Sequence, residues 1–338
     1  MKFLKAKFDL VKPQEKKMDV LETEKAIKET REYFQENLAS KLNLSRISAP
    51  LIVEDKTGFN DDLNGVERKV NMCLKSGVKA SIVQSLAKWK RYALKKYGLK
   101  PYTGMYTNMN ALRIDEDISN IHSYYVDQWD WELVINEKDR TIEYLKSVVK
   151  DIYEVIKSTE SFVRSKYTHL SEKLPQDIKF FYTSELEERY PDLSPKEREY
   201  EICKENKAVF LMQVGKVLKS GQKHDGRAPD YDDWELNGDI LVYNSILDIP
   251  FELSSMGVRV SKESMLKQLK ECNAMEKCEM VYHRMILNDE LPFTLGGGIG
   301  QSRLCMFLLE KIHIGEVQVS EWDDKTKQYC EERNITLL

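Results

Sequence analysis

A succession of strand-like runs is the feature that most constrains how this chain of 338 residues can fold. The runs lie at 79–83, 123–132, 208–214, 239–243 and 251–260. Several of them follow one another without a helix between each pair. That pattern favours an α+β fold, in which an antiparallel sheet is flanked by helices, over a doubly wound parallel sheet.

Apolar residues that repeat every three or four positions predict the flanking helices. These helices are expected at about 20–42, 142–156, 262–288 and 304–313. In the first of them Ile27, Phe34 and Leu38 share one face. No internal repeat, low-complexity tract or Pro/Gly-rich linker divides the chain. We therefore expect one domain over 1–338, with 1–19 as a polar leader that could add an edge strand.

Composition narrows the class of protein. The net charge of −4 lacks the basic excess of a protein that mainly grips nucleic acid. No apolar run approaches the roughly 20 residues that span a bilayer, and the first residues are too polar for a signal peptide. Six scattered cysteines form no C-x-x-C or zinc-site spacing. We expect reduced thiols in a cytoplasmic protein without membrane or nucleic-acid partners.

A glycine-rich segment, Leu295-Gly-Gly-Gly-Ile-Gly-Gln-Ser-Arg303, precedes the last predicted helix. Gln301 stands where a dinucleotide motif requires its last glycine, and the Gly-Lys-Ser/Thr of a P-loop is absent. The segment resembles motif 3 of class II aminoacyl-tRNA synthetases, where glycines let the backbone approach the nucleotide and an arginine lies against adenine or phosphate. Alone, it is equally compatible with a helix entry that carries a surface arginine.

A second arginine opens a carboxylate-rich loop that resembles motif 2 of the same class. Arg113 lies in Leu112-Arg-Ile-Asp-Glu-Asp117, and a strand follows. The guanidinium is expected to grip the α-phosphate of ATP bidentately. On the strand, Gln128 and Asp130 share one face because side chains alternate, and the tryptophans beside them point into the core. A charged hairpin with a half-buried strand is the alternative.

Two acids on neighbouring strands, Asp239 and Glu252, form a candidate magnesium site. Mg²⁺ needs hard oxygen ligands from a few side chains, with phosphate and water completing the shell. Arg259 follows Glu252 by seven residues, so a regular strand sends the two side chains to opposite faces. Both can reach one pocket only through a bulge, which we expect within 254–257. The alternative is a pair of solvent-facing acids.

The segment Gln84-Ser-Leu-Ala-Lys-Trp-Lys-Arg91 lies where a strand meets a helix. Ser85 is a suitable N-cap. Lys88 and Lys90 then fall in the first two turns, where the helix dipole disfavours positive charge. A nearby anion would relieve this. In aspartate-specific synthetases a lysine in a matching segment and the arginine matching Arg259 hold one substrate carboxylate. Ordinary surface lysines are the alternative.

Together and in this order, the segments resemble the ammonia-dependent asparagine synthetase (aspartate–ammonia ligase) family, a relative of the class II synthetase catalytic core. The match covers nearly the whole chain. Its strongest runs are Asp61-Asp-Leu-Asn-Gly65, 84–91, 111–117, 125–132, Arg227-Ala-Pro-Asp-Tyr-Asp-Asp-Trp234, 236–239, 251–259 and 296–303. The resemblance implies a class II-like catalytic domain without an anticodon-binding domain, and a homodimer.

The activity that the resemblance implies is ATP-dependent synthesis of L-asparagine from L-aspartate and ammonia. Its intermediate would be β-aspartyl-AMP, and its by-products AMP and pyrophosphate. Aspartate would contact Asp61, Ser85, Lys90, Gln128, Asp130, Asp232, Ser255 and Arg259. ATP would contact Arg113, Asp115, His122, Gly298 and Arg303, and Mg²⁺ would bind Asp239 and Glu252. The implied catalytic residues are Arg113, Asp232 and Arg303.

Within this set, Lys90 and Arg259 would hold the α-carboxylate, and Asp61, beside Gln128, the α-ammonium. Asp232 would take a proton from ammonia after attack. Free ammonia is the expected donor because Lys2, rather than a cysteine, follows Met1.

Two alternatives to this activity can be compared with the sequence. An aspartyl- or asparaginyl-tRNA synthetase would need an anticodon-binding barrel, and roughly 45 residues before the recognisable core are too few for one. A non-catalytic relative would be expected to lack key site residues. However, Arg113, Asp239, Glu252 and Arg303 are all present.

Overall fold

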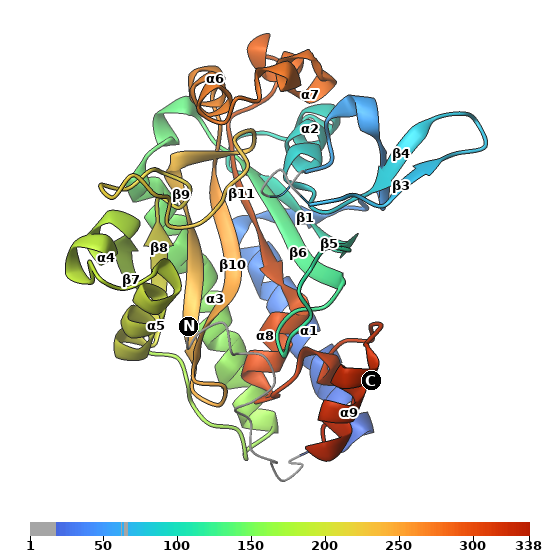
Figure 1. Cartoon of the computed structure of the whole chain (residues 1–338), viewed down its shortest axis with the longest axis vertical. Helices are drawn as coiled ribbons and strands as arrows, with labels where there is room; N and C mark the ends of the chain where they lie inside the picture. The colour runs from blue at the N-terminus through green and yellow to red at the C-terminus, as the bar shows by residue number, and fades with distance from the viewer. Residues whose placement is uncertain (1–17, 62, 64–66) are drawn as a thin grey trace.

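The computed structural model describes residues 18–61, 63 and 67–338 (Figure 1). Most of the predicted polar leader, and with it the predicted edge strand, lies outside these residues. Within the described ranges, no helix is both long enough and apolar enough to cross a bilayer.

An eight-stranded sheet forms the centre of the molecule, in the order β1-β5-β6-β11-β10-β9-β8-β7. The strands are β1 (Leu44–Arg46), β5 (Gly104–Leu112), β6 (Tyr125–Val134), β11 (Thr294–Gly300), β10 (Ile249–Arg259), β9 (Asp232–Asn244), β8 (Ala208–Met212) and β7 (Lys179–Tyr182). The interior pairs are antiparallel, as predicted. The outer pairs, β1–β5 and β7–β8, are parallel, so the sheet is mixed and the prediction of a purely antiparallel sheet was wrong.

The parallel edges follow from the connections. A parallel pair requires a crossover that carries the chain back to the same end of the sheet. Helices α4 (Thr183–Arg189) and α5 (Pro195–Asn206) provide it between β7 and β8, and α2 (Ala87–Tyr97) lies in the longer connection between β1 and β5. The sequence showed no strand-like run at β7, which has only four residues.

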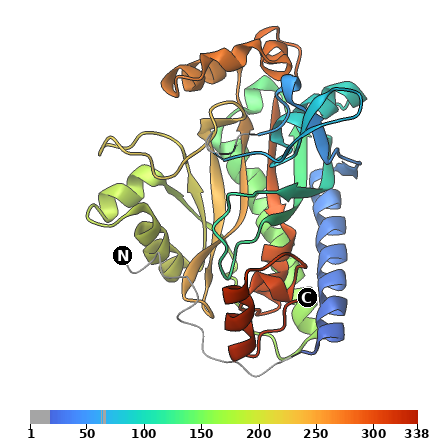
Figure 2. The same cartoon turned by 45° about the vertical axis from the view of Figure 1, so that its right-hand side comes forward.

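Two long helices cover one face of the sheet: α1 (Val20–Leu42) and α3 (Ile142–Lys166). In Figure 2, α1 is the long blue helix at the right, which runs along the lower part of the molecule. The apolar stripes predicted for both helices are confirmed, because residues of both belong to the main hydrophobic core. In α1, for example, Phe34 packs on Trp129 of β6 with their ring centroids 4.5 Å apart. Because this face is apolar, the polar side chains of the same strands point to the other face.

The predicted helix at 262–288 is broken into three pieces: α6 (Lys262–Glu271), the 3₁₀ turn η4 (Met275–Glu279) and α7 (Val281–Leu287). It ends early because Asn273 takes a left-handed conformation, with φ of 53°. The pieces cover one end of the sheet, at the top of Figure 1. The helix predicted at 304–313 begins and ends earlier, as α8 (Gln301–Leu308).

Smaller elements complete the fold. A three-stranded sheet in the order β2-β4-β3 projects from the body, at the right of Figure 1. Its strands are β2 (Ile52–Glu54), β3 (Asn71–Cys73) and β4 (Lys79–Ile82), so the predicted run at 79–83 belongs to this sheet. The remaining helices are η2 (Asp55–Thr57), η3 (Glu137–Asp139), η5 (Ile314–Glu316) and α9 (Asp324–Glu332).

Candidate active site

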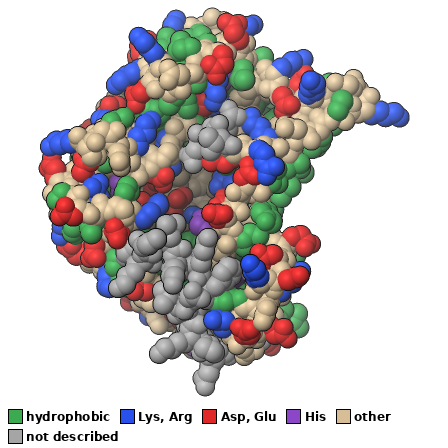
Figure 3. All heavy atoms as spheres, in the orientation of Figure 1, with side chains coloured by type: hydrophobic (Ala, Val, Ile, Leu, Met, Phe, Trp, Pro, Cys, Tyr) green, Lys and Arg blue, Asp and Glu red, His purple; other side chains and the backbone are tan. Residues whose placement is uncertain are grey.

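A cavity of about 470 Å³ opens on the face of the central sheet that α1 and α3 leave free. In the orientation of Figure 1, the surface is hollowed near the middle of this face, with acidic and basic side chains around the hollow (Figure 3). Strands β6, β10 and β11 supply its floor. Most predicted site residues line it: Ser85, Lys90, Arg113, Asp115, His122, Gln128, Asp130, Asp232, Glu252, Ser255, Arg259, Gly298 and Arg303.

Two predicted residues, Asp61 and Asp239, are not among the lining side chains. Asp61 is fully buried, with Oδ1 3.7 Å from Nζ of Lys88. Asp239 is nearly buried and paired with Arg227, which does line the cavity. The structure therefore places both carboxylates behind the wall of the cavity.

The glycines of β11 make room for polar side chains of β6. Gly298 pairs with Asp130 across the two strands. A Cβ at Gly298 would collide with the side-chain oxygens of Gln128 and Asp130, which lie above it. Likewise, a Cβ at Gly296 would collide with a side-chain oxygen of Glu132. The glycine-rich segment thus lets three polar side chains of one strand lie flat over its neighbour.

A bulge in β10 brings Glu252 and Arg259 to the same side. Glu252 pairs with Leu241 of β9 whereas Ser254 pairs with the adjacent residue, so Leu253 is extra. The additional residue shifts the alternation by one, and Glu252, Ser255 and Arg259 all line the cavity. The need for a bulge is confirmed, and it lies at Leu253, one residue before the predicted range.

Lys90 is a buried cation at the substrate end. Its Nζ donates to the carbonyl oxygens of Trp131, at 3.0 Å, and Gly297, at 2.8 Å. Oδ1 of Asp130 lies 3.5 Å away. Burial lowers the pKa of Lys90 and raises that of Asp130, while each charge opposes the shift of the other.

The start of α2 differs from the prediction. Leu86 is the N-cap and makes no side-chain cap bond. Ser85, which was predicted to be the N-cap, lies one residue before it, and its hydroxyl accepts a hydrogen bond from the amide of Ala87 at 3.2 Å. Lys88 and Lys90 are buried beside carboxylates. These negative charges offset the unfavourable position of two lysines near the N-terminus of a helix.

Arg259 joins two acids. Its Nε and Nη2 donate to Glu132 at 2.9 and 2.7 Å, and its Nη1 donates to Asp232. Burial would raise the pKa of Glu132, but Arg259 holds it below its ordinary value. Burial does raise the pKa of Asp232 in spite of Arg259. Glu132 was missed as a site residue, although the alternation that selected Gln128 and Asp130 also selects it.

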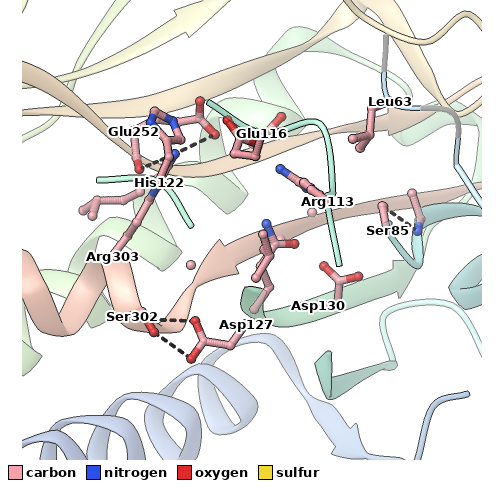
Figure 4. Close-up of a pocket in the computed structure, with 18 of the residues that line it drawn as sticks. Leu63, Ser85, Arg113, Glu116, His122, Asp127, Asp130, Glu252, Ser302 and Arg303 are labelled. Atoms are coloured by element: carbon pink, nitrogen blue, oxygen red, sulfur yellow. Dashed lines mark hydrogen bonds and ion pairs between the residues drawn. The ribbon is translucent and has the colours of Figure 1, made fainter. Parts of the chain in front are cut away.

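Arg113 and Arg303, the two arginines predicted to bind nucleotide, both line the cavity (Figure 4). Nε of Arg113 is buried without a hydrogen-bond partner in the part of the chain that the structure describes, and Nη2 makes only a 3.5 Å contact to the carbonyl of Gln84. Nη1 of Arg303 donates to the carbonyl oxygen of Glu252 at 3.1 Å. Arg113 therefore has donor capacity left for an anionic ligand.

His122 and Asp115 have different surroundings. Burial, helped by the positive charges of Arg303 and Arg113, lowers the pKa of His122 to about 3, so the ring is neutral near pH 7. Its Nδ1 lies 2.9 Å from the hydroxyl of Ser119. The carboxylate of Asp115 is held by Arg68, whose Nη2 lies 2.5 Å from Oδ1.

Of the two candidate metal ligands, Glu252 lines the cavity and Asp239 lies behind its wall. Burial raises the pKa of Asp239 to about 6 against the pull of Arg227, and the charge of Glu252 adds to the rise. The buried carboxylate of Asp239 calls for a cation, which Arg227 provides, whereas the side chain of Glu252 is partly exposed. The hard oxygens of both carboxylates suit Mg²⁺ if phosphate and water complete the shell. No larger group of potential metal ligands occurs among the described side chains.

Sequence reasoning assigned no role to two further cations of the cavity, Arg227 and Lys196. Arg227 belongs to the recognised segment 227–234, so a signal was available. Lys196, near the start of α5, lies 3.1 Å from Glu199 and 3.3 Å from Asp225, and no sequence pattern marks it.

Comparison with known proteins fits this site. A family model described as aspartate-ammonia ligase matches residues 21–334. The chain belongs to the aspartate–ammonia ligase family. Among relatives named aspartate–ammonia ligase, that of Ruminiclostridium cellulolyticum is 54% identical, over 97% of this chain and 99% of its own. That of Pediococcus pentosaceus is also 54% identical, over 98% of this chain and 100% of its own.

Solved structures similar to this member of the family are class II aminoacyl-tRNA synthetases. Asparaginyl-tRNA synthetase from Pyrococcus horikoshii, complexed with asparaginyl-adenylate, has a TM-score of 0.63 at 14% identity, covering 88% of this chain and 68% of its own. Aspartyl-tRNA synthetase from Entamoeba histolytica has a TM-score of 0.59 at 15% identity, covering 90% of this chain and 58% of its own. The predicted class II-like fold is confirmed.

Proposed function

We propose that this chain makes L-asparagine from L-aspartate, ammonia and ATP through β-aspartyl-AMP, releasing AMP and pyrophosphate. Relatives that carry the name aspartate–ammonia ligase match nearly the full length, at about half identity. One observation carries the proposal: Arg113, with donor capacity free, opens into the same cavity as the cations Lys90 and Arg259. A dicarboxylic amino acid held at one end would present its other carboxylate to a phosphate at Arg113.

At the substrate end, Lys90 and Arg259 would bind the α-carboxylate of aspartate. Gln128 and Asp130 would face its ammonium, with Asp61 behind the wall and Ser85 and Ser255 lining the cavity. Gly298 leaves this floor open. Since the buried cations are already balanced by acids, one carboxylate and one ammonium can enter together without a large change in the net charge of the site.

At the nucleotide end, Arg113 would grip the α-phosphate and stabilise the charge that builds as a carboxylate oxygen attacks phosphorus. Arg303 would lie against phosphate or adenine, and neutral His122 would offer a hydrogen bond. Asp239 and Glu252 would hold Mg²⁺, with Arg227 released from Asp239 toward the phosphates. When bound, the ion would neutralise phosphate charge.

In the second step, ammonia would attack the β-carbonyl carbon and the bond to the AMP oxygen would break. The new ammonium must lose a proton, which Asp232 would accept. Burial raises the pKa of Asp232, which makes its carboxylate a stronger base than an exposed one. Its bond to Arg259 fixes the orientation of the carboxylate.

The test is direct. The purified chain is incubated with ATP, Mg²⁺, aspartate and ammonium, and products are resolved by chromatography. Asparagine and AMP in equal amounts are expected. ADP in place of AMP would indicate an acyl-phosphate route and overturn the proposal.

The proposal also includes the cellular location and the oligomeric state of the chain. A cytoplasmic location is expected from the scattered thiols. A homodimer is expected from the family, and sedimentation equilibrium should then give twice the chain mass of 39.6 kDa. A concentration-independent single-chain mass would contradict it.

A further inference from the structure

A buried charged cluster lies behind the aspartate end of the cavity. It contains Asp61, Lys88, Asp230 and His283, and none of these side chains is more than 1% exposed. Nζ of Lys88 is 2.8 Å from Oδ2 of Asp230 and 3.7 Å from Oδ1 of Asp61. The proposed reaction gives no role to Lys88, Asp230 or His283.

The two carboxylates of this cluster are unequally satisfied. Oδ2 of Asp230 also lies 2.9 Å from Nε2 of His283 and 3.6 Å from Nζ of Lys277. Both oxygens of Asp61, but only Oδ1 of Asp230, are buried without a hydrogen-bond partner among the described residues. Accordingly, burial raises the pKa of Asp61, whereas its charged neighbours hold the pKa of Asp230 well below the ordinary value in spite of burial.

The segment that carries Asp230 is held from the α6–α7 side. Nε2 of Gln268, in α6, donates to the carbonyl oxygens of Pro229 and Asp232 at 3.0 and 2.9 Å. His283, in α7, reaches the Asp230 carboxylate between them. Main chain and side chain are thus fixed on both sides of Tyr231, which lines the cavity.

The negative charge of Asp61 affects Tyr231, a residue that lines the cavity. Burial raises the pKa of Tyr231, and the negative charges of Asp61 and Asp232 add to the rise. Asp61 therefore acts on a lining residue, although its own side chain does not line the cavity. The ion pair between Asp61 and Lys88 is long, at 3.7 Å. Asp61 therefore attracts a further cation strongly, because a poorly neutralised charge is costly in a low-dielectric interior.

We infer that Asp230 is a positioning residue that draws Lys88 away from Asp61, so that the α-ammonium of aspartate can take the place of a counter-ion there. The inference rests on the proposed function. Without the charge of Asp230, Lys88 would turn to Asp61 and compete with the substrate.

The test compares three variants with the wild type by calorimetric titration of aspartate and by steady-state kinetics. Asp230→Asn should weaken aspartate binding, and raise KM for aspartate, by about tenfold or more, because a charge-assisted contact is lost. KM for ATP should stay within about twofold, since the nucleotide end is unchanged. The double variant Asp230→Asn/Lys88→Met should regain most of the aspartate affinity.

The double variant separates this role from a structural one, because a merely destabilised loop would not recover when a second buried group is removed. No recovery, or equal losses for ATP and aspartate, would overturn the inference. If Asp230→Asn does not fold, Lys88→Met decides alone. It should leave KM for aspartate unchanged or lower, whereas Lys90→Met, in the same helix, should raise it. A tenfold rise in Lys88→Met would refute the competition.

Failure of the proposed function would look different. The wild type would then make no asparagine and AMP, whatever the variants do. The calorimetric comparison measures aspartate binding without turnover, so it still decides whether Asp230 governs access to Asp61.

Discussion

At the scale of single residues, the site is a set of charges whose pairing determines what can bind. Lys90 and Arg259 already donate to carbonyl and carboxylate oxygens of the chain, whereas Arg113 keeps an unused buried donor among the described residues. The motif-like segments predicted these three cations. They did not predict the acids that balance them, because the pairing of Arg259 with Glu132 joins residues 127 positions apart and is decided by the sheet register.

The free donor of Arg113 gives the first prediction. Arg113→Ala should lower kcat/KM for AMP formation by about 10²–10³, since an arginine aimed at developing phosphate charge is lost. The measurement is initial-rate kinetics with circular dichroism to verify the fold. Arg189→Ala, which removes a half-exposed arginine paired with Glu205, is the control and should retain wild-type rates. Near-normal turnover in Arg113→Ala would remove its assigned role.

Asp239 gives a prediction on stability. Its pKa is about 6 in the folded chain against an ordinary 3.8, so between these values the folded state binds more protons than the unfolded state. The stability of the wild type must therefore fall as pH rises through this window. Asp239→Asn lacks this titration, so between pH 4 and pH 7 its free energy of unfolding should increase relative to that of the wild type by about 2 kcal/mol.

Chemical denaturation at several pH values measures that difference. Glu331→Gln, at an exposed position of α9, serves as the control and should run parallel to the wild type. If the free energy of unfolding of Asp239→Asn minus that of the wild type stayed constant with pH, or decreased from pH 4 to pH 7, Asp239 would not be the titrating group.

At the scale of elements, the structure shows which features are local enough to be predicted. The stripes of α1 and α3 and the alternation of β6 are set by neighbours in sequence, and all three were predicted. The break at Asn273 depends on one residue adopting positive φ, and the crossover at β7 depends on where a four-residue strand docks. Neither leaves a periodic signal. The bulge was predicted only because Glu252 and Arg259 had to share a pocket.

Strand β11 offers a test at this scale. Gly298→Ala should place a Cβ against the oxygens of Gln128 and Asp130 and displace both. Overpacking of this kind costs about 1–3 kcal/mol, so KM for aspartate should rise by roughly tenfold or more while the fold persists. Gly300→Ala is the matched control on the same strand, because its Cβ would meet mainly the Arg303 side chain, at 3.1 Å. If both variants raised KM for aspartate equally, Gly298 would not specifically shape the floor of the cavity.

At the scale of the whole molecule, the site exists only when distant segments are assembled. Ser85 precedes α2, Gln128 lies in β6, Asp232 begins β9, and Arg303 lies in α8. The unfolded chain cannot bring these groups together, so ligands that use both ends of the cavity bind the folded state alone. Their binding free energy then adds to the stability of the entire domain.

The last prediction follows from that linkage. L-asparagine and AMP together, each at about 100 times its dissociation constant, should each stabilise the chain by about 2.7 kcal/mol, seen as a rise in the midpoint of thermal unfolding. Arg113→Ala should lose the AMP part and keep the asparagine part, whereas Lys90→Met should do the reverse. Because the two ends are separate sets of side chains in one cavity, the contributions should divide in this way. If both variants lost both contributions equally, the ligands would share one subsite, and the division of the cavity into a substrate end and a nucleotide end would be wrong.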